Sequence, residues 1–441
     1  MPRRSVQIVT LGCSKNTVDT EHILYQVREL LDVIPAGEDA PYVDYLLLNT
    51  CGFIGDAKEE SINAIFEAVG RKQEGRIGRL IVFGCLSQRY ASEMPGLIPE
   101  VDEWYGARDF DPVIRALGGE PRECDRTGRA FTEDHPGSAY LKISEGCNRR
   151  CSYCAISGIR GPHVSVPVEN LVEEAKFLAA SGVKELILIA QDTTYYGLDI
   201  YHRRALAELL RALSAVDGIE WIRIHYSYPT DFPEDVLDEM ASNPKVCPYM
   251  DIPLQHVSDK VLDMMHRHCT GEITRNLVRS LRERVPGVAL RTTMIVGFPG
   301  EGEEEFQELL DFVRETRFER LGAFTYSEEE GTYGADHFAD DIPQEVKEER
   351  LSRLMDLQRQ ISSDYNLSRV GSVEKVIVDG FTDEYLVCRS RYESLEVDGE
   401  ILVKYMPERL GGRSREDLVG EFITAKITAA DDYDLVAEPT L

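Results

Sequence analysis

Six apolar, strand-like segments alternate with amphipathic helical stretches through the middle of this chain, and this alternation constrains the fold more than any other feature. The segments are Tyr140–Ile143, Glu185–Ala190, Trp221–His225, Tyr249–Ile252, Ala289–Val296 and Leu321–Tyr326. Strands separated by helices form a parallel sheet, because a parallel connection needs a long crossover. A complete eight-unit barrel takes about 250 residues, more than this region holds. The pattern therefore predicts an open or partial (β/α)6 barrel.

The first third of the chain shows the same alternation on a smaller scale. Apolar runs at Val6–Leu11, Tyr45–Leu48 and Leu80–Phe83 are separated by helical periodicity at Val18–Leu31 and Glu59–Val69. This pattern predicts a separate α/β domain with a parallel sheet.

Changes in patterning suggest where these regions begin and end. We expect an N-terminal domain at residues 1–118, a polar linker at 119–137 and the barrel at 138–343. A charged helix at 344–367 then connects to residues 368–441, where strand-like segments are short and broken by Asp, Gly and Pro. Such a segment pattern predicts a small all-β barrel.

The composition excludes several classes of protein. Of 441 residues, 78 are acidic and 49 basic, and the net charge of −29 disfavours nonspecific binding to nucleic acid. No apolar run approaches the roughly 20 residues of a membrane helix, and the N-terminus does not suit a signal peptide. We therefore expect a cytoplasmic protein with no membrane partner. In that compartment the ten cysteines point to metal binding or catalysis before disulfides.

Three of these cysteines, Cys147, Cys151 and Cys154, form a C-x3-C-x2-C pattern after the first strand of the barrel region. Three thiolates at this spacing can ligate three irons of a [4Fe–4S] cluster and leave the fourth iron open. The alternative is a structural zinc site, which needs a fourth ligand; His163 is the nearest histidine downstream. The spacing favours the iron–sulfur site.

Another three, Cys13, Cys51 and Cys85, each stand just past the carboxyl end of a predicted strand of the N-terminal domain. In an open parallel sheet those ends face one crevice, where ligands bind. They therefore form a candidate second site. The alternative is that they are small buried residues at strand ends, a common location for cysteine.

Taken together, these features resemble the radical SAM methylthiotransferases over nearly the whole chain. The resemblance rests on the C-x3-C-x2-C loop with Tyr153 before its last cysteine, the segments YLKISEGCN and MIVGFPGE, the three spaced cysteines ahead and the β module behind. It implies two [4Fe–4S] clusters and S-adenosylmethionine as cofactors. Cys147, Cys151 and Cys154 would hold the cluster that binds S-adenosylmethionine, and Cys13, Cys51 and Cys85 an auxiliary cluster.

Two segments distinguish the branches of that family. LGCSKNTVDTE is similar to the LGCPKN-x-VDSE pattern of the branch that modifies ribosomal protein uS12 (RimO type), whereas the branch that modifies tRNA adenosine (MiaB type) usually has a GCQMN-like sequence there. CRSRYESLEVDG also resembles the RimO type. Proline is usual at the positions of Ser14 and Leu395, so the resemblance carries over the metal ligation but not the fine details of substrate contact.

The RimO-type resemblance implies insertion of a methylthio group at the β-carbon of an aspartate in uS12. That C–H bond is neither acidic nor electrophilic, so a radical derived from S-adenosylmethionine is the chemical answer. The auxiliary cluster would carry the sulfur, and a second S-adenosylmethionine would give the methyl group. An electron donor such as flavodoxin or ferredoxin is a further implied partner.

Five residues are candidates for contacts to S-adenosylmethionine. Tyr153 would lie near the adenine by analogy, with packing against the loop as the alternative. Gln191 and Asp192 follow a predicted strand directly, at its carboxyl end. Gly297 and Gly300 in IVGFPGE allow backbone approach to a ligand, although a tight turn also explains them.

Charged residues elsewhere have simpler interpretations. Arg160 and Arg291 are candidates to pair with a carboxylate of the cofactor or substrate, or with one of the chain's own. The acidic runs Glu303–Glu305 and Glu328–Glu330 are interpreted as solvated faces.

The β module provides a further indication of the partner. It resembles a TRAM domain, and residues 368–441 hold nine basic and 16 acidic side chains. RNA binding calls for a basic face, so we expect no stable tRNA binding and favour a basic protein partner such as uS12. Because the whole chain is acidic, two alternatives stay open: a tRNA adenosine methylthiotransferase, and a non-catalytic iron–sulfur or RNA-binding protein.

Overall fold

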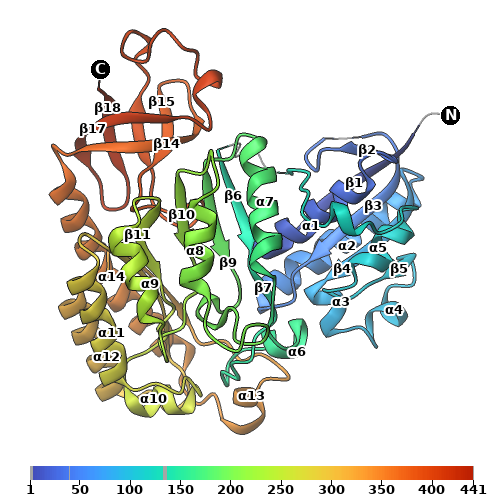
Figure 1. The fold of residues 1–441 in the computed structure, drawn as a ribbon. Helices are drawn as coiled ribbons and strands as arrows, with labels where there is room; N and C mark the ends of the chain where they lie inside the picture. The colour runs from blue at the N-terminus through green and yellow to red at the C-terminus, as the bar shows by residue number, and fades with distance from the viewer. Residues whose placement is uncertain (1–2, 39, 133–136, 441) are drawn as a thin grey trace.

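The N-terminal part of the computed structural model, which describes residues 3–38, 40–132 and 137–440, is a five-stranded parallel sheet covered by helices (Figure 1). The strand order is β2-β1-β3-β4-β5, and the strands are β1 (Arg4–Thr10), β2 (Leu31–Ile34), β3 (Val43–Thr50), β4 (Ile77–Gly84) and β5 (Glu103–Trp104). The helices are α1 (Ser14–Val27), α2 (Gly55–Gln73), α3 (Cys85–Arg89), α4 (Met94–Leu97) and α5 (Phe110–Ala116). The predicted parallel-sheet α/β domain is confirmed.

One predicted element of this domain is wrong. The helix expected to run to Leu31 ends at Val27, and Leu31 begins β2, which pairs in parallel with β1. Val27 and Leu31 are four residues apart and both buried in the same apolar cluster. That spacing imitates the period of a helix although the chain turns between them.

The central part is a six-stranded parallel sheet in the order β13-β12-β11-β10-β9-β6. The strands are β6 (Ser138–Lys142), β9 (Glu185–Ile189), β10 (Trp221–Ile224), β11 (Val246–Asp251), β12 (Ala289–Val296) and β13 (Arg320–Thr325). No pairing joins β13 to β6 in the described chain, so the sheet stays open as a partial barrel, as predicted.

Helices cover this sheet and bury one large apolar core against it. The longer ones are α7 (Val168–Ala180), α8 (Leu206–Ser214), α9 (Glu234–Ser242), α11 (Gly271–Arg284) and α12 (Glu303–Thr316). Shorter elements lie in the loops: β7 (Ser144–Glu145), β8 (Val164–Ser165), α6 (Ile156–Arg160), α10 (Asp259–Met264) and α13 (Tyr333–His337). None of the described helices is long and apolar enough to cross a membrane.

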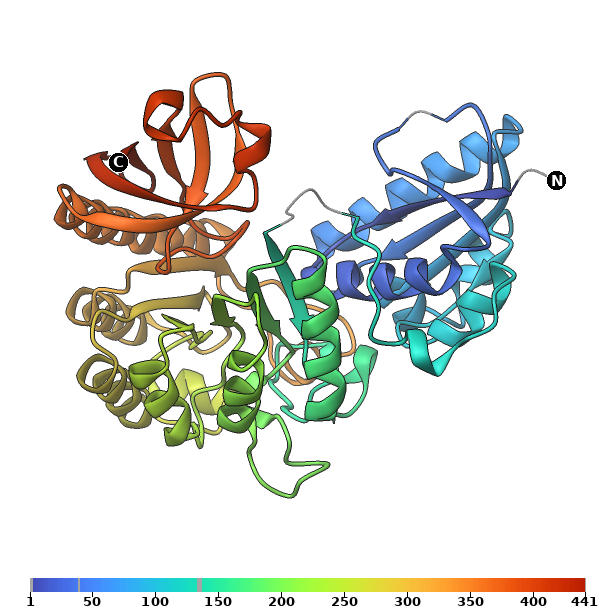
Figure 2. The ribbon, with the colours of Figure 1, turned by 45° about the horizontal axis from the view of Figure 1, so that its top comes forward.

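Helix α14 (Gln344–Arg369) leads from the central part into a closed five-stranded barrel. Its strands are β14 (Val373–Phe381), β15 (Tyr385–Arg389), β16 (Ile401–Lys404), β17 (Phe422–Ala430) and β18 (Leu435–Pro439). This confirms the predicted all-β barrel. Figures 1 and 2 show this barrel and the N-terminal domain attached to different sides of the central part.

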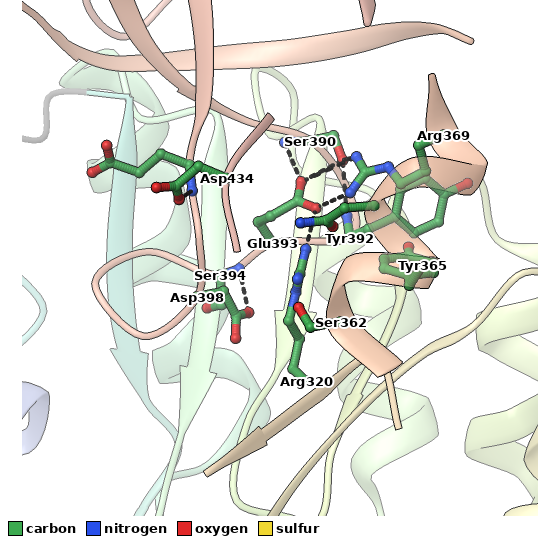
Figure 3. Close-up of polar contacts among 12 residues, drawn as sticks. Arg320, Ser362, Tyr365, Arg369, Ser390, Tyr392, Glu393, Ser394, Asp398 and Asp434 are labelled. Carbon is green, nitrogen blue, oxygen red and sulfur yellow. Dashed lines mark hydrogen bonds and ion pairs between the residues drawn. The ribbon is translucent and has the colours of Figure 1, made fainter. Parts of the chain in front are cut away.

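The loop between β15 and β16 joins the closed barrel to the open one. Glu393 of this loop is fully buried and accepts hydrogen bonds from Arg320 of β13 (2.9 Å) and from Arg369 of α14 (Figure 3). Leu395, at a position where the family pattern has proline, is also buried, in a cluster that includes Tyr140 and Val18. The departure from proline therefore lies in an interdomain core.

The predicted linker is held in place where the structure describes it; residues 133–136 lie outside the described residues. Arg129 is buried and donates to Glu21 of α1 (2.8 Å) and to Glu174 of α7 (2.9 Å). This segment therefore connects the N-terminal and central parts through buried ion pairs.

Candidate active site

The three cysteines of the N-terminal domain come together because β1, β3 and β4 are neighbours in the sheet. Cys13 precedes α1, Cys51 follows β3 directly and Cys85 begins α3. Burial raises the pKa of Cys85 to about 11; Arg160 opposes this rise, and Cys13 and Cys51 add to it. The three thiols are thus close enough to influence one another.

Glycine makes this close approach possible. Gly12 has φ +94°, and a Cβ at this position would lie 2.7 Å from the Cβ of Cys51. Gly84, before Cys85, has φ +107° and would place a Cβ 2.6 Å from the carbonyl oxygen of Thr50. Any other residue would force these loops apart.

The second set lies in the loop between β7 and α6. The loop is fixed by Ser152, whose Oγ donates to the carbonyl of Met264 (2.7 Å) and whose amide donates to that of Met265 (3.0 Å). Burial raises the pKa of Cys147 to about 11 and that of Cys154 to about 12. Cys151 contributes to both rises, so these thiols also interact.

The donor chemistry of both sets fits iron–sulfur clusters. All ten cysteines are free of disulfides. Thiols with a raised pKa, such as those of Cys85, Cys147 and Cys154, stay protonated alone and lose their protons to a bound metal. In the described part of the chain, no three His, Cys, Asp or Glu side chains are placed to hold one metal ion. A single tetrahedral zinc ion needs Zn–S bonds of about 2.3 Å and therefore closely spaced ligands. A four-iron cluster is wider, and its cysteine ligands stand further apart, so the spacing of the thiols suits the cluster better than zinc.

Tyr153 and a residue that the sequence analysis missed lie beside the second set. Arg267 is buried, and its NH1 donates to the Sγ of Cys151 (3.6 Å) and to the Oη of Tyr153 (3.3 Å). Tyr153 also packs against an apolar cluster that includes Phe298. His266 and His268, which flank Arg267, have φ near +50°. No sequence pattern signals this uncommon backbone conformation or the burial of Arg267 between the two histidines.

Gln191 and Asp192 lie just beyond the carboxyl end of β9. Gln191 donates to Glu145 (3.1 Å), while its Oε1 is buried and has no partner among the described residues. Asp192 accepts from Arg149 Nε (2.8 Å), and Arg149 NH2 is likewise buried without a partner in that part of the chain. These free polar atoms suit a polar ligand.

Gly297 and Gly300 are explained by packing within the chain. A Cβ at Gly297 would lie 2.3 Å from the Cγ of Lys347, and one at Gly300 would lie 2.6 Å from the Sδ of Met264. Whether a ligand also approaches these glycines stays a prediction.

Three segments of the chain match known families. Residues 5–106 match the Uncharacterized protein family UPF0004, residues 141–313 the Radical SAM superfamily and residues 370–439 the TRAM domain. The ribosomal protein uS12 methylthiotransferase RimO of Bacteroides thetaiotaomicron is 47% identical over 439 residues, which cover 99% of each chain. That of Porphyromonas gingivalis is 47% identical over 438 residues, again 99% of each.

This chain belongs to the RimO family of methylthiotransferases. As a radical SAM enzyme and a transferase, it uses an iron–sulfur cluster and S-adenosylmethionine. Among solved structures, the radical S-adenosylmethionine methyltransferase TsrM from Kitasatospora setae superposes with a TM-score of 0.56 at 14% identity, covering 76% of this chain and 74% of TsrM. That likeness concerns the fold alone.

Asn16 of the segment LGCSKNTVDTE stands at a position that is asparagine in both the RimO-type and the MiaB-type patterns, and its contacts hold the cysteine loops in place. The side-chain amide of Asn16 donates to the carbonyl of Leu11 (2.7 Å), ahead of Cys13, and to that of Thr50 (3.4 Å), ahead of Cys51. Its Oδ1 accepts from Arg160. Asn16 therefore ties two of the three cysteine loops to the central domain.

Arg160 and Arg291 pair with the chain's own carboxylates. Arg160 NH1 donates to Asp19 and to Glu145, each at 2.9 Å, and its Nε donates to the Sγ of Cys85 (3.2 Å). Arg291 donates to Asp251 (2.9 Å). Of the alternatives open for these arginines, the structure shows the internal ion pair.

The interpretation of Glu328–Glu330 as a solvated face is wrong for Glu329, which is 5% exposed. Its carboxylate accepts from the amide of Gly55 (3.0 Å), at the start of α2, and from Lys58 Nζ (2.8 Å). Arg89 NH1 donates to the carbonyl of Gly52 (2.7 Å) and to Glu329 (3.4 Å). A residue after β13 thus holds the segment that follows Cys51, a tertiary contact that local charge patterning does not reveal.

Proposed function

We propose that this chain adds a methylthio group to the β-carbon of an aspartate in ribosomal protein uS12, and that it does so with two [4Fe–4S] clusters. The RimO relatives act on uS12 by name and match this chain from end to end. The observation that carries the two-cluster proposal is the presence of two separate three-cysteine sets joined through Arg160.

Each set has its own role in this proposal. Cys147, Cys151 and Cys154 hold the cluster that binds S-adenosylmethionine, and the set made of Cys13, Cys51 and Cys85 holds the auxiliary cluster. When bound, these groups supply a carbon-centred radical and the sulfur.

The chain's own residues then bind and orient S-adenosylmethionine. We assign this role to Tyr153, Gln191, Asp192, Gly297 and Gly300. Asp192 accepts a hydrogen bond from Arg149 and so orients it. The Oε1 of Gln191 has no partner in the described part of the chain and is available to accept a hydrogen bond from the ligand.

The acidic chain suits a basic protein partner and does not suit stable tRNA binding. We further propose a cytoplasmic location and an electron donor of the flavodoxin or ferredoxin class, since a one-electron step is needed.

The test is the intact mass of uS12 from cells with and without the gene. One methylthio group in place of hydrogen adds about 46 Da, and we expect this gain on one aspartate-containing peptide only when the gene is present. An unchanged uS12, with loss of a methylthio group from a tRNA nucleoside instead, would assign the chain to the tRNA reaction.

A further inference from the structure

Lys15 is a buried cation for which the described part of the chain supplies no anion. It lies in the first turn of α1, two residues after Cys13, and its side chain is 7% exposed. Nζ lies 3.3 Å from the ring centroid of Tyr226, across the interface between the N-terminal and central domains. Among the residues that the structure describes, no carboxylate pairs with Lys15 and no hydrogen bond reaches its Nζ.

The neighbouring buried cations of the same interface are all paired. Lys142 pairs with Asp19 and Glu145, Arg160 with the same two carboxylates, and Arg129 with Glu21 and Glu174. A buried ammonium group without an anion is costly. The contact with an aromatic ring offsets only part of this cost. Lys15 is therefore suited to an anion that comes from outside the chain.

The ring beneath Lys15 is held in an uncommon backbone conformation. Tyr226 has φ +56°, which is strained for a bulky residue. Its amide donates to Asp251 (2.9 Å), and its carbonyl accepts from the amide of Thr193 (3.1 Å). Strain of this kind persists where the surroundings impose it, and it is concentrated at functional sites.

The position of Lys15 is suited to the reacting group. Tyr226 follows β10, which lies between β9 and β11 in the open sheet, at the end where Gln191 and Asp192 follow β9. Lys15 thus reaches from beside Cys13 to the strand ends that carry the radical SAM site.

We propose that Lys15 binds the side-chain carboxylate of the substrate aspartate and so determines that the enzyme selects aspartate. This inference rests on the proposed function. The carboxylate is bonded to the β-carbon that reacts, so one ion pair both selects the residue and positions the carbon. A carboxylate of S-adenosylmethionine has the same chemistry, and the test separates the two.

The experiment measures Kd of the reconstituted holoenzyme for uS12 and for uS12 in which the modified aspartate is asparagine. Lys15→Met removes the charge and keeps the length of the side chain; methionine also stands at this place in the GCQMN pattern. Lys15→Arg keeps the charge. Lys176→Met is the matched control, because Lys176 is exposed on α7, where it pairs with Glu173. Iron content and Kd for S-adenosylmethionine are measured for each protein.

We expect the wild type to bind the aspartate form on the order of 30-fold more tightly than the asparagine form. Lys15→Met should lose this preference, Lys15→Arg should retain part of it, and Lys176→Met all of it, with wild-type iron content throughout. The proposal is overturned if the wild type binds the aspartate and asparagine forms of uS12 with equal Kd. It is also overturned if the wild type binds neither form measurably. A preference that survives in Lys15→Met, or weaker binding of S-adenosylmethionine alone in that variant, overturns it as well. The mass of uS12 from cells tests the function separately.

Discussion

The Nε of Arg160 lies 3.2 Å from the Sγ of Cys85, although Arg160 belongs to the central domain and Cys85 to the N-terminal domain. Arg160 ends α6, which begins two residues after Cys154. One guanidinium therefore connects the loop of the radical SAM cysteines with the auxiliary set. Because it also pairs with Asp19 of α1, it fixes how the two sets face each other.

Replacing Arg160 should loosen this arrangement. Arg160→Met removes one of the two cations that pair with the buried Asp19 among the described residues, the other being Lys142. The free energy of unfolding should therefore fall by about 3 kcal/mol. Iron bound by the auxiliary set should fall with it. Urea unfolding and iron analysis measure both effects. Arg203→Met, which removes an exposed pair with Glu208, should change neither; equal effects of the two substitutions would contradict the assigned role.

Glu329 should stabilise the start of α2 from another domain. Glu329→Gln removes the charge that pairs with Lys58 and Arg89, so stability should fall by about 2 kcal/mol, and amide hydrogen exchange should rise near Gly55. Glu328→Gln is the control, because Glu328 is exposed. Unchanged exchange near Gly55 in Glu329→Gln would show that the contact is not formed in solution.

Gly12 should tolerate no side chain. Gly12→Ala forces a Cβ against Cys51 in addition to the strain of φ +94°, so we expect a loss of about 2 kcal/mol and less auxiliary iron. Gly75→Ala carries a similar strain at φ +75° with nothing within 4 Å. Gly75→Ala should therefore lower the free energy of unfolding less than Gly12→Ala does, and its iron content should stay at the wild-type value. A larger loss in Gly75→Ala than in Gly12→Ala would refute the packing explanation.

Low pH should weaken the interface between the two barrels. Glu185 of β9 is buried and pairs with Arg223 of β10 and with Arg389 of β15, a strand of the closed barrel. Burial tends to raise the pKa of Glu185, but the two arginines outweigh this effect and lower the pKa to about 2. Because the pKa of this carboxyl is lower in the folded than in the unfolded state, its ionisation stabilises the fold at pH values above the unfolded pKa of 4.5. This stabilisation is lost as the pH falls toward 2.

Glu185→Gln should therefore be about 3 kcal/mol less stable at pH 7 and show a flatter dependence of stability on pH between 4.5 and 2. Urea unfolding across this range measures it. Glu173→Gln, an exposed substitution on α7, should retain the wild-type profile. A wild-type profile in Glu185→Gln would be incompatible with the buried ion pairs.

The elements that could be predicted from the sequence are those with a local pattern. The six βα units follow from periodicity, and Cys13, Cys51 and Cys85 can be predicted because each stands just past the carboxyl end of a predicted strand. The short edge strand β2 was hidden because Val27 and Leu31 share a helical spacing.

Residues that act across domains were not predictable in this way. Arg267 lies between two histidines of positive φ and contacts Cys151, which is 116 residues earlier in the chain. Glu329 contacts a helix more than 270 residues earlier in the chain. The partners of such groups are set by how the domains pack, which no short pattern encodes.

In the proposed function, the two cysteine sets hold separate clusters with separate tasks. The direct measurement compares iron content and products of the wild type with those of the variant in which Cys13, Cys51 and Cys85 are alanine. We predict about eight irons in the wild type and about four in the variant, which should still cleave S-adenosylmethionine to 5′-deoxyadenosine but leave the mass of uS12 unchanged. Equal iron in the two proteins, or methylthiolated uS12 from the variant, would contradict the account.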